Sequence, residues 1–195
     1  QVVLLQIATS SRSEVDEYRE LRETLDAMAG RINGRYAEYD WVPLRYVNRA
    51  YSQAALAGLY RAADIALVTP LRDGMNLVAK EFIAAQDPAD PGVLILSRFA
   101  GAARELKEAL IVNPYDQAEM ADALHRALAM PLDQRQWRWQ AMMNTLRGSD
   151  IGIWRQRFVD TLCSLPVQGE RPVNGANGGT NGGVAGHRQA AMARL

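Results

Sequence analysis

The amino-acid sequence predicts an α/β fold built on a doubly wound parallel sheet, and two observations support this prediction. Short apolar runs of strand length alternate with segments whose apolar residues recur every three or four positions, and the connections between them are short. This alternation is typical of parallel strands joined by right-handed helical crossovers, with helices on both faces of the sheet. A chain of 195 residues is long enough for one substantial domain and hardly for two.

The first strand–helix unit lies at the start of the chain. Residues 2–7 form a continuous apolar run, which is typical of a strand covered on both faces. Ser13 can cap a following amphipathic helix, and Asn33 and Gly34 are residues that commonly end one. The run begins abruptly, with neither an initiator Met nor a basic segment before it, so we expect a piece of a longer protein rather than a signal peptide.

The next two units follow the same plan. Residues 44–47 predict a second strand, and Ser52 can cap the helix after it. Residues 65–68 predict a short buried strand, residues 69–75 a loop, and residues 76–86 a helix.

The remainder of the chain predicts further elements and a tail. A cluster of Asp, Pro and Gly residues at 87–92 is typical of a turn. We expect strands at 93–96 and 109–112, a helical segment near 102–106, and helices at 117–130, 132–147 and 151–165. Residues 166–195 are rich in Gly and Asn and bury too little apolar surface to offset chain entropy, which predicts a disordered tail after a domain at 1–165.

Composition excludes several classes of function. Lys plus Arg equals Asp plus Glu at 22 each, so no overall charge attracts nucleic acid or an anionic membrane. The single cysteine, Cys163, excludes an internal disulfide and suits the cytoplasm; we expect it to be a small buried side chain. With only His125 and His187, a site of several histidines is excluded, and no apolar run approaches the roughly 20 residues of a membrane span.

The loop after the third predicted strand is the candidate binding site. In open parallel sheets, ligands bind where the carboxyl ends of strands lead into helices. Gly74 permits a tight turn and a close backbone approach, and the N–H groups of Met75, Asn76 and Leu77 would face a diphosphate or sugar hydroxyls at the positive end of a helix. An ionised Asp73 accepts hydrogen bonds from vicinal hydroxyls. Asp-Gly is also a common turn, and an acidic residue near a helix start can be a simple dipole partner.

The segment that continues this loop resembles a known signature. Residues 69–81, with the sequence TPLRDGMNLVAKE, are similar to the donor-site motif of the trehalose-6-phosphate synthases. Residues 6–12, 29–34, 97–103 and 111–115 match the same family in order, so the resemblance covers about residues 1–165.

The resemblance implies a fold and a reaction. Members of this family have two Rossmann-like domains facing a cleft, the GT-B architecture, and this chain is similar to the donor-binding C-terminal half. They transfer glucose from UDP-glucose to glucose-6-phosphate with retention at the anomeric carbon, without a metal or other cofactor. We therefore expect UDP-glucose and glucose-6-phosphate as substrates, an N-terminal acceptor domain as the partner, and a possible homo-oligomer.

The resemblance also implies roles for individual residues. Asp73 matches the catalytic-site carboxylate that holds hydroxyls of the donor glucose, and Glu81 matches the carboxylate on the ribose. Tyr51 stands where the family places an aromatic, usually phenylalanine, beside the uracil, and Arg12 matches the cation that reaches the acceptor phosphate. The full donor-binding set that the resemblance implies is Tyr51, Asp73, Gly74, Met75, Asn76, Leu77, Val78, Ala79, Lys80 and Glu81.

Some parts of the family's machinery are not found in this chain. The acceptor domain with its donor-contacting histidine, and an Arg/Lys pair that neutralises the departing diphosphate, would precede Gln1. Because transfer depends on orientation and on stabilising that charge, we expect the isolated chain to be inactive. Two alternatives stay open: a related glucosylglycerol-phosphate synthase that uses ADP-glucose, and a noncatalytic nucleotide-sugar-binding module.

Overall fold

The computed structural model describes residues 1–8, 16–149 and 151–164, and it confirms the α/β fold class. Every ladder between its strands is parallel, as predicted. Arg12, Ser13, His187 and the expected tail lie outside the described residues. The elements in chain order are β1 (Leu4–Ile7), α1 (Asp16–Tyr36), β2 (Leu44–Val47), α2 (Gln53–Ala62), β3 (Ile65–Val68), α3 (Leu77–Ala85), β4 (Val93–Ser97), the 3₁₀ helix η1 (Gly101–Arg104), β5 (Leu110–Val112), α4 (Gln117–Leu128), α5 (Leu132–Arg147) and α6 (Ile151–Ser164).

The described strands divide between two sheets rather than forming one. Strands β1 and β2 pair with Leu4 opposite Leu44, and β3, β4 and β5 form a second sheet in sequence order. Leu4 and Leu5 of β1 remain 47% and 41% exposed. The prediction that this run is covered on both faces is therefore wrong for the described residues, which leave both side chains largely uncovered.

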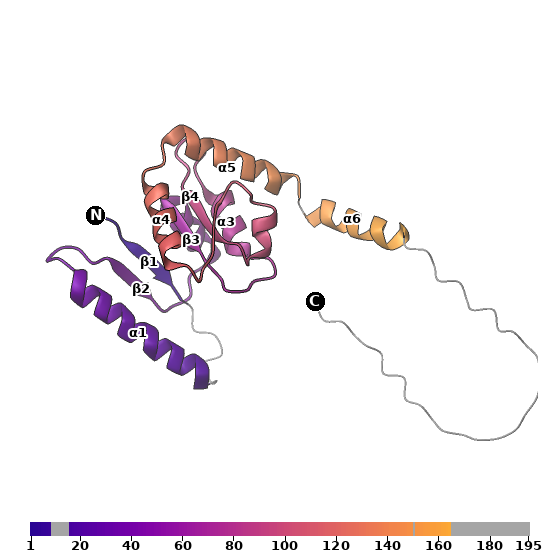
Figure 1. Cartoon of the computed structure of the whole chain (residues 1–195). Helices are drawn as coiled ribbons and strands as arrows, with labels where there is room; N and C mark the ends of the chain where they lie inside the picture. Colours follow the sequence, from indigo (N-terminus) through magenta and orange to yellow (C-terminus); the bar gives the residue numbers. More distant parts are fainter. Residues whose placement is uncertain (9–15, 150, 165–195) are drawn as a thin grey trace, which may run out of the picture. The chain divides into compact units, whose positions relative to one another are not determined.

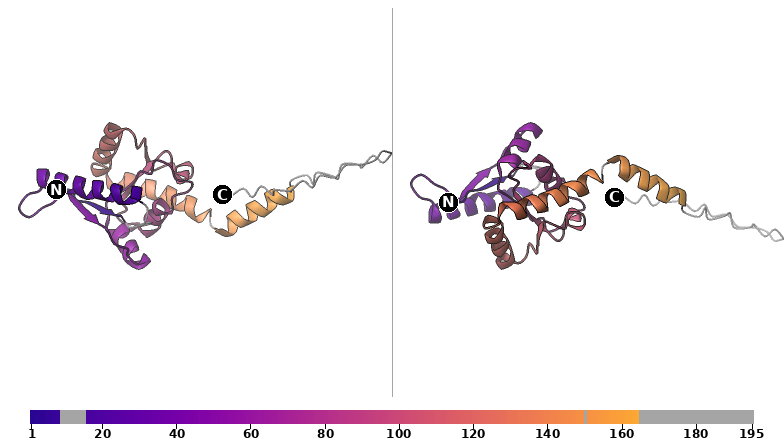
Figure 2. Two further views of the ribbon diagram at one scale, coloured as in Figure 1. Left: turned by 90° about the horizontal axis from the view of Figure 1, so that it is seen from below. Right: turned by 90° about the horizontal axis from the view of Figure 1, so that it is seen from above.

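Helix α1 lies along the β1–β2 pair in both views of Figure 2 and continues past the residues expected to end it. The amide of Asn33 is engaged elsewhere: its Nδ2 donates to the carbonyl of Leu44 at 2.9 Å, and its Oδ1 accepts from the N–H of Leu44 at 3.2 Å. The backbone meanwhile stays helical, since the N–H of Ala37 donates to the carbonyl of Asn33 at 2.8 Å. Asn33 thus fastens the helix to the start of β2 instead of ending it.

Strand β4 forms the centre of the core, and its side chains alternate between two buried clusters. Leu94 and Leu96 pack with α3 and α5, whereas Val93 and Ile95 pack with β5 and the alanines of α4. This period of two is what the geometry of a strand imposes. Figure 1 shows α3 and α4 on opposite sides of β3 and β4, which matches the predicted double covering of this sheet.

Helix α5 is anchored by Trp139. Its ring is buried, and its Nε1 donates to the carbonyl of Ile83 at 2.9 Å. Trp139 is thus a packing residue, whereas Trp137 is 62% exposed in the described structure. A tryptophan three or four positions from a buried one shares its helix face, whereas one two positions away does not.

The chain divides into two compact units, Gln1–Ile153 and a second that begins at Trp154. Within the second unit, the rings of Trp154 and Phe158 stack with centroids 5.3 Å apart. Cys163 is exposed on α6, so the expectation of a buried thiol is wrong. The last turn of α6 leaves its side chain uncovered.

Candidate functional site

The candidate loop connects β3 to α3 at the carboxyl end of the three-stranded sheet. Because β3, β4 and β5 are parallel, the segments that follow them emerge at the same edge. The sequence therefore brings residues 69–76, 98–101 and 113–116 to one side of the sheet, which is the location that ligands of such sheets prefer.

Asp73 holds the loop together with both carboxylate oxygens. Its Oδ1 accepts from the N–H of Met75 and its Oδ2 accepts from Nδ2 of Asn76, each at 3.0 Å. A carboxylate oxygen accepts more than one hydrogen bond, so the half-buried group keeps capacity for two hydroxyls. The loop thereby fixes the direction in which the carboxylate faces.

Asn76 is the N-cap of α3 and adopts an unusual backbone conformation. Its φ of 76° and ψ of 91° make it the one non-glycine residue with positive φ in the described ranges. Asn tolerates this region better than most residues, and its Oδ1 accepts from the N–H of Ala79 at 2.9 Å. Such conformations persist where the surroundings enforce them and are concentrated at binding sites.

Only some of the N–H groups at the start of α3 that were predicted to face a ligand are without an acceptor in the structure. In the described structure those of Asn76, Leu77 and Val78 have no acceptor, as expected for a helix N-terminus. The N–H of Met75 was predicted to face a ligand, but it donates to Asp73. A ligand anion at this terminus would thus meet the following three amides instead.

A second segment, residues 99–102, holds the backbone of the loop through hydrogen bonds. The N–H of Asp73 donates to the carbonyl of Phe99 at 3.2 Å, and its own carbonyl accepts from the N–H of Gly101 at 3.0 Å. The N–H of Ala102 donates to the carbonyl of Met75 at 2.7 Å. These bonds form a short parallel bridge between Asp73 and Ala100 outside the main sheet.

The close approach that the sequence suggested for Gly74 occurs at Gly101. A Cβ on Gly101 would overlap the carbonyl oxygen of Gly74 and lie 2.8 Å from its carbonyl carbon. A Cβ on Gly74 would meet no atom of the chain within 4 Å, and its φ lies outside the positive range. The chain bends at Gly74, as expected, and leaves open space on that side, whereas the position that is crowded by the chain itself is Gly101.

The side chains predicted along α3 have different surroundings. Leu77, Val78 and Glu81 are exposed, whereas Ala79 is fully buried in the core. Lys80, whose role the spacing left open, pairs with Glu105 at the end of η1 through Nζ and Oε2 at 2.8 Å. The helix thus presents Glu81 outward and uses Lys80 to hold η1.

Glu81 lies close to Tyr60 of α2 and affects the pKa of its hydroxyl. Burial of the Tyr60 ring raises the pKa of its hydroxyl, and the nearby Glu81 carboxylate raises it further. The proton of Tyr60 is therefore held beside the carboxylate that the sequence assigns to a ribose.

Tyr51 is half-buried and already has a partner. The guanidinium of Arg49 lies 4.8 Å from the ring centroid, and its Nε donates to the Tyr51 hydroxyl at 3.0 Å. Arginine on an aromatic face is a favourable cation–π pair. Of the other site predictions, Arg12 lies outside the described residues.

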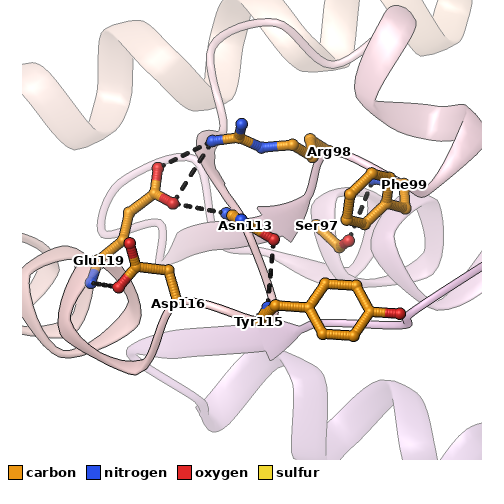
Figure 3. A network of polar contacts seen from close by, with 7 residues as sticks. All are labelled: Ser97, Arg98, Phe99, Asn113, Tyr115, Asp116 and Glu119. Atoms are coloured by element: carbon orange, nitrogen blue, oxygen red, sulfur yellow. Dashed lines mark hydrogen bonds and ion pairs between the residues drawn. The ribbon is translucent and has the colours of Figure 1, made fainter.

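A polar network that sequence reasoning did not assign lies beside the loop and is shown in Figure 3. Arg98 pairs with Glu119 at 3.1 Å, and Oε2 of Glu119 also accepts from the N–H of Asn113 at 2.8 Å. The ring of Phe99 meets Tyr115 edge to face at 5.9 Å. The only sequence signal was the family match of residues 97–103 and 111–115, which carried no role for these side chains.

Among the described residues, no helix combines the length and apolar character needed to cross a membrane. In the same ranges, no three His, Cys, Asp or Glu side chains are grouped so as to hold a metal ion.

Comparison with known proteins identifies the family of the chain. The model of glycosyltransferase family 20 matches residues 1–164, which include the loop, α3 and the network of Figure 3. The chain belongs to glycosyltransferase family 20. Within the family, it is 56% identical over 164 residues to a trehalose-6-phosphate synthase of Sinorhizobium fredii and 57% identical over 157 residues to one of Citrobacter koseri.

Solved structures of family 20 proteins share the fold. An alpha,alpha-trehalose-phosphate synthase of Burkholderia xenovorans in complex with glucose-6-phosphate superposes with a TM-score of 0.81 at 53% identity, over 84% of this chain and 36% of that one. An E. coli protein bound with UDP-2-fluoro glucose gives 0.80 at 52% identity, over 83% of this chain and 36% of that one. The matches with the S. fredii and C. koseri proteins cover 84% and 80% of this chain, but only 35% and 33% of those proteins.

Proposed function

We propose that this chain is the nucleotide-sugar-binding part of a trehalose-6-phosphate synthase, which transfers glucose from UDP-glucose to glucose-6-phosphate with retention and releases UDP. Identity of 56% to a relative with that name supports the proposal, because the match includes the whole loop and its supports. The relatives solved with glucose-6-phosphate and with UDP-2-fluoro glucose are consistent with both substrates.

The loop geometry suggests how the donor would be held. Asp73, oriented by its two internal hydrogen bonds, would accept from hydroxyls of the glucose. The unpartnered amides of Asn76, Leu77 and Val78 suit sugar hydroxyls or phosphate oxygens, with the positive end of α3 behind them. The exposed Glu81, one turn further along, would accept from the ribose.

The transfer itself needs positive charge opposite the departing diphosphate. Lys80 and Arg98, two cations close to the loop, are already paired with Glu105 and Glu119. In this proposal, the chain binds and orients the donor, the part of the enzyme just upstream supplies the cations, and an acceptor domain supplies the acceptor site.

Titration calorimetry with UDP, ADP, UDP-glucose and ADP-glucose tests the proposal. We expect uridine compounds to bind more tightly than adenine compounds, and Glu81→Ala to weaken all binding by about ten- to a hundredfold, the effect of losing one or two hydrogen bonds to a charged group. Glu23→Ala, which removes an exposed carboxylate from α1, is the matched control and should leave affinity unchanged.

The outcomes separate the alternatives. Tighter binding of ADP-glucose than of UDP-glucose would indicate an ADP-glucose-dependent transferase such as a glucosylglycerol-phosphate synthase. Binding of nucleotide sugars with no transfer by the complete protein would indicate a noncatalytic module. Failure of every nucleotide to bind would contradict a donor site formed by this chain alone.

The setting of the protein is part of the proposal. We propose a cytoplasmic enzyme that needs no metal cofactor and can form a homo-oligomer. Dialysis of the complete enzyme against EDTA should leave transfer unchanged, and light scattering after gel filtration should give a mass above that of one subunit. Loss of activity that Mg²⁺ restores would contradict the first expectation, and a monomer the second.

A further inference from the structure

The backbone of the donor loop is set by contacts that come from outside the loop. Three hydrogen bonds of 2.7 to 3.2 Å connect Asp73 and Met75 to residues 99–102. Asp73 takes part through both its N–H and its carbonyl, so the residue whose carboxylate would hold the sugar is fixed on both sides. Its side chain direction therefore depends on where this second segment lies.

Gly101 makes this arrangement possible. Its backbone packs so closely against Gly74 that any Cβ would overlap the Gly74 carbonyl oxygen and approach the Met75 Cα to 3.2 Å. The obstructing atoms are backbone, so no side-chain rotation can relieve the overlap. A larger residue here would have to push the loop away from its support.

The support is itself held in place. Its first residues follow β4, where the N–H of Arg98 donates to the carbonyl of Val112 at 2.9 Å and its side chain pairs with Glu119 of α4 (Figure 3). Its far end continues into η1, whose cap residue Glu105 pairs with Lys80. Ala100 and Ala102 are buried at 2% and 0% exposure, so the segment cannot move aside without disturbing the core.

We propose that Gly101 is a positioning residue for the donor sugar: its lack of a side chain lets residues 99–102 act as a rigid backbone template that fixes the direction of the Asp73 carboxylate and the conformation of Asn76. The inference rests on the proposed function and deepens it. The template acts on the sugar-binding loop and not on Glu81, which lies further along α3, so it affects recognition of the glucose more than recognition of the nucleotide.

The decisive test compares Gly101→Ala with Gly58→Ala by titration with UDP and with UDP-glucose. Gly58 is an exposed glycine of α2 where a Cβ would meet nothing within 4 Å, so the same substitution there is the matched control. We expect Gly101→Ala to weaken UDP-glucose binding about tenfold and UDP binding clearly less, because UDP lacks the sugar that Asp73 would hold and keeps its contact with Glu81. Gly58→Ala should match the wild type for both ligands.

Hydrogen exchange of the unliganded protein tests the template independently of any nucleotide. In Gly101→Ala we expect faster exchange at the amides of residues 73, 101 and 102, which donate the three hydrogen bonds of the template. The amides of β4 should stay protected and serve as the reference for folding. Unchanged exchange at these amides, or an unchanged UDP-glucose affinity, would overturn the inference. An equal loss of UDP and UDP-glucose affinity would also overturn it, since that indicates general damage.

The two proposals fail in different ways. If the wild type binds no nucleotide, the proposed function fails and the exchange result alone decides whether the template exists. If Gly101→Ala does not fold, glycolate can replace Gly101. The ester oxygen then stands in place of the N–H that donates to the Asp73 carbonyl, and no side chain is added. The inference then requires the same selective loss of UDP-glucose affinity.

Discussion

At the scale of single residues, the carboxylate of Asp73 combines two tasks. It orients its own loop by accepting from Met75 and Asn76, and it keeps the capacity to accept from a ligand. A residue that only capped the turn would not need a support on both sides of its backbone. The turn role that the sequence left open is therefore present, and the proposed binding role would use the acceptor capacity that remains.

Asp73→Asn separates these tasks. The oxygen of the new amide can still accept a hydrogen bond. Its NH₂ group, however, would face a donor, either the Met75 N–H or the Asn76 Nδ2, and an NH₂ group cannot accept from sugar hydroxyls. We expect UDP-glucose affinity to fall about tenfold or more, with UDP affinity nearly unchanged. Calorimetry measures both, with Asp122→Asn on the exposed face of α4 as control. Retained UDP-glucose affinity would remove Asp73 from the site.

Tyr60 predicts a dependence on alkaline pH. Its pKa is raised by burial first and by Glu81 second, so the folded state holds the phenolic proton more tightly than the unfolded state. This contribution to the free energy of unfolding is complete below the ordinary tyrosine pKa and is lost as pH rises through the raised pKa. An ultraviolet phenolate titration should show a late phase that Tyr60→Phe lacks. In Glu81→Ala the phase should move to lower pH; an unmoved phase would contradict the assignment.

At the scale of elements, the start of α4 connects three segments. Asp116 caps the helix by accepting from the N–H of Glu119 at 3.0 Å, and Glu119 reaches back to the N–H of Asn113 and across to Arg98. The ion pair is largely exposed and contributes little, whereas the part-buried N–H of Asn113 needs its acceptor.

Glu119→Ala should therefore lower the free energy of unfolding by about 1–2 kcal/mol, chiefly through the unpaired Asn113 amide. Urea denaturation measures the change, and Asp122→Ala in the same helix controls for loss of a carboxylate. We also expect weaker UDP-glucose binding, since Arg98 begins the segment that supports the loop. A stability equal to the control would show that water replaces the lost acceptor.

The sequence predicted elements where the signal is local and failed where a distant partner intervenes. Ser52 caps α2, accepting from the N–H of Ala55 at 3.3 Å, and residues 65–68 form β3, both as predicted from nearby residues. The end of α1 was wrong because Asn33 bonds to Leu44, which no helix-ending pattern encodes. The close packing of Gly101 against Gly74 could not be predicted for the same reason, because the two glycines belong to separate strand–helix units.

At the scale of the whole molecule, the chain represents about a third of each relative it matches, 35% for the S. fredii protein. We expect the isolated chain to form no trehalose-6-phosphate from UDP-glucose and glucose-6-phosphate, because orientation and charge stabilisation come partly from the remaining portion. A coupled assay of UDP release, with a complete family 20 enzyme as positive control, measures this. Product formation by the chain alone would contradict the proposed division of labour.

The short bridge between Asp73 and Ala100 also limits how the site can vary in length. An inserted or deleted residue between Asp73 and Met75 would put at least one of the three backbone hydrogen bonds out of register. Redesign of sugar preference must therefore proceed by exchanging loop side chains such as Met75 on a backbone of constant length. Libraries with loop insertions at this position should yield no binders.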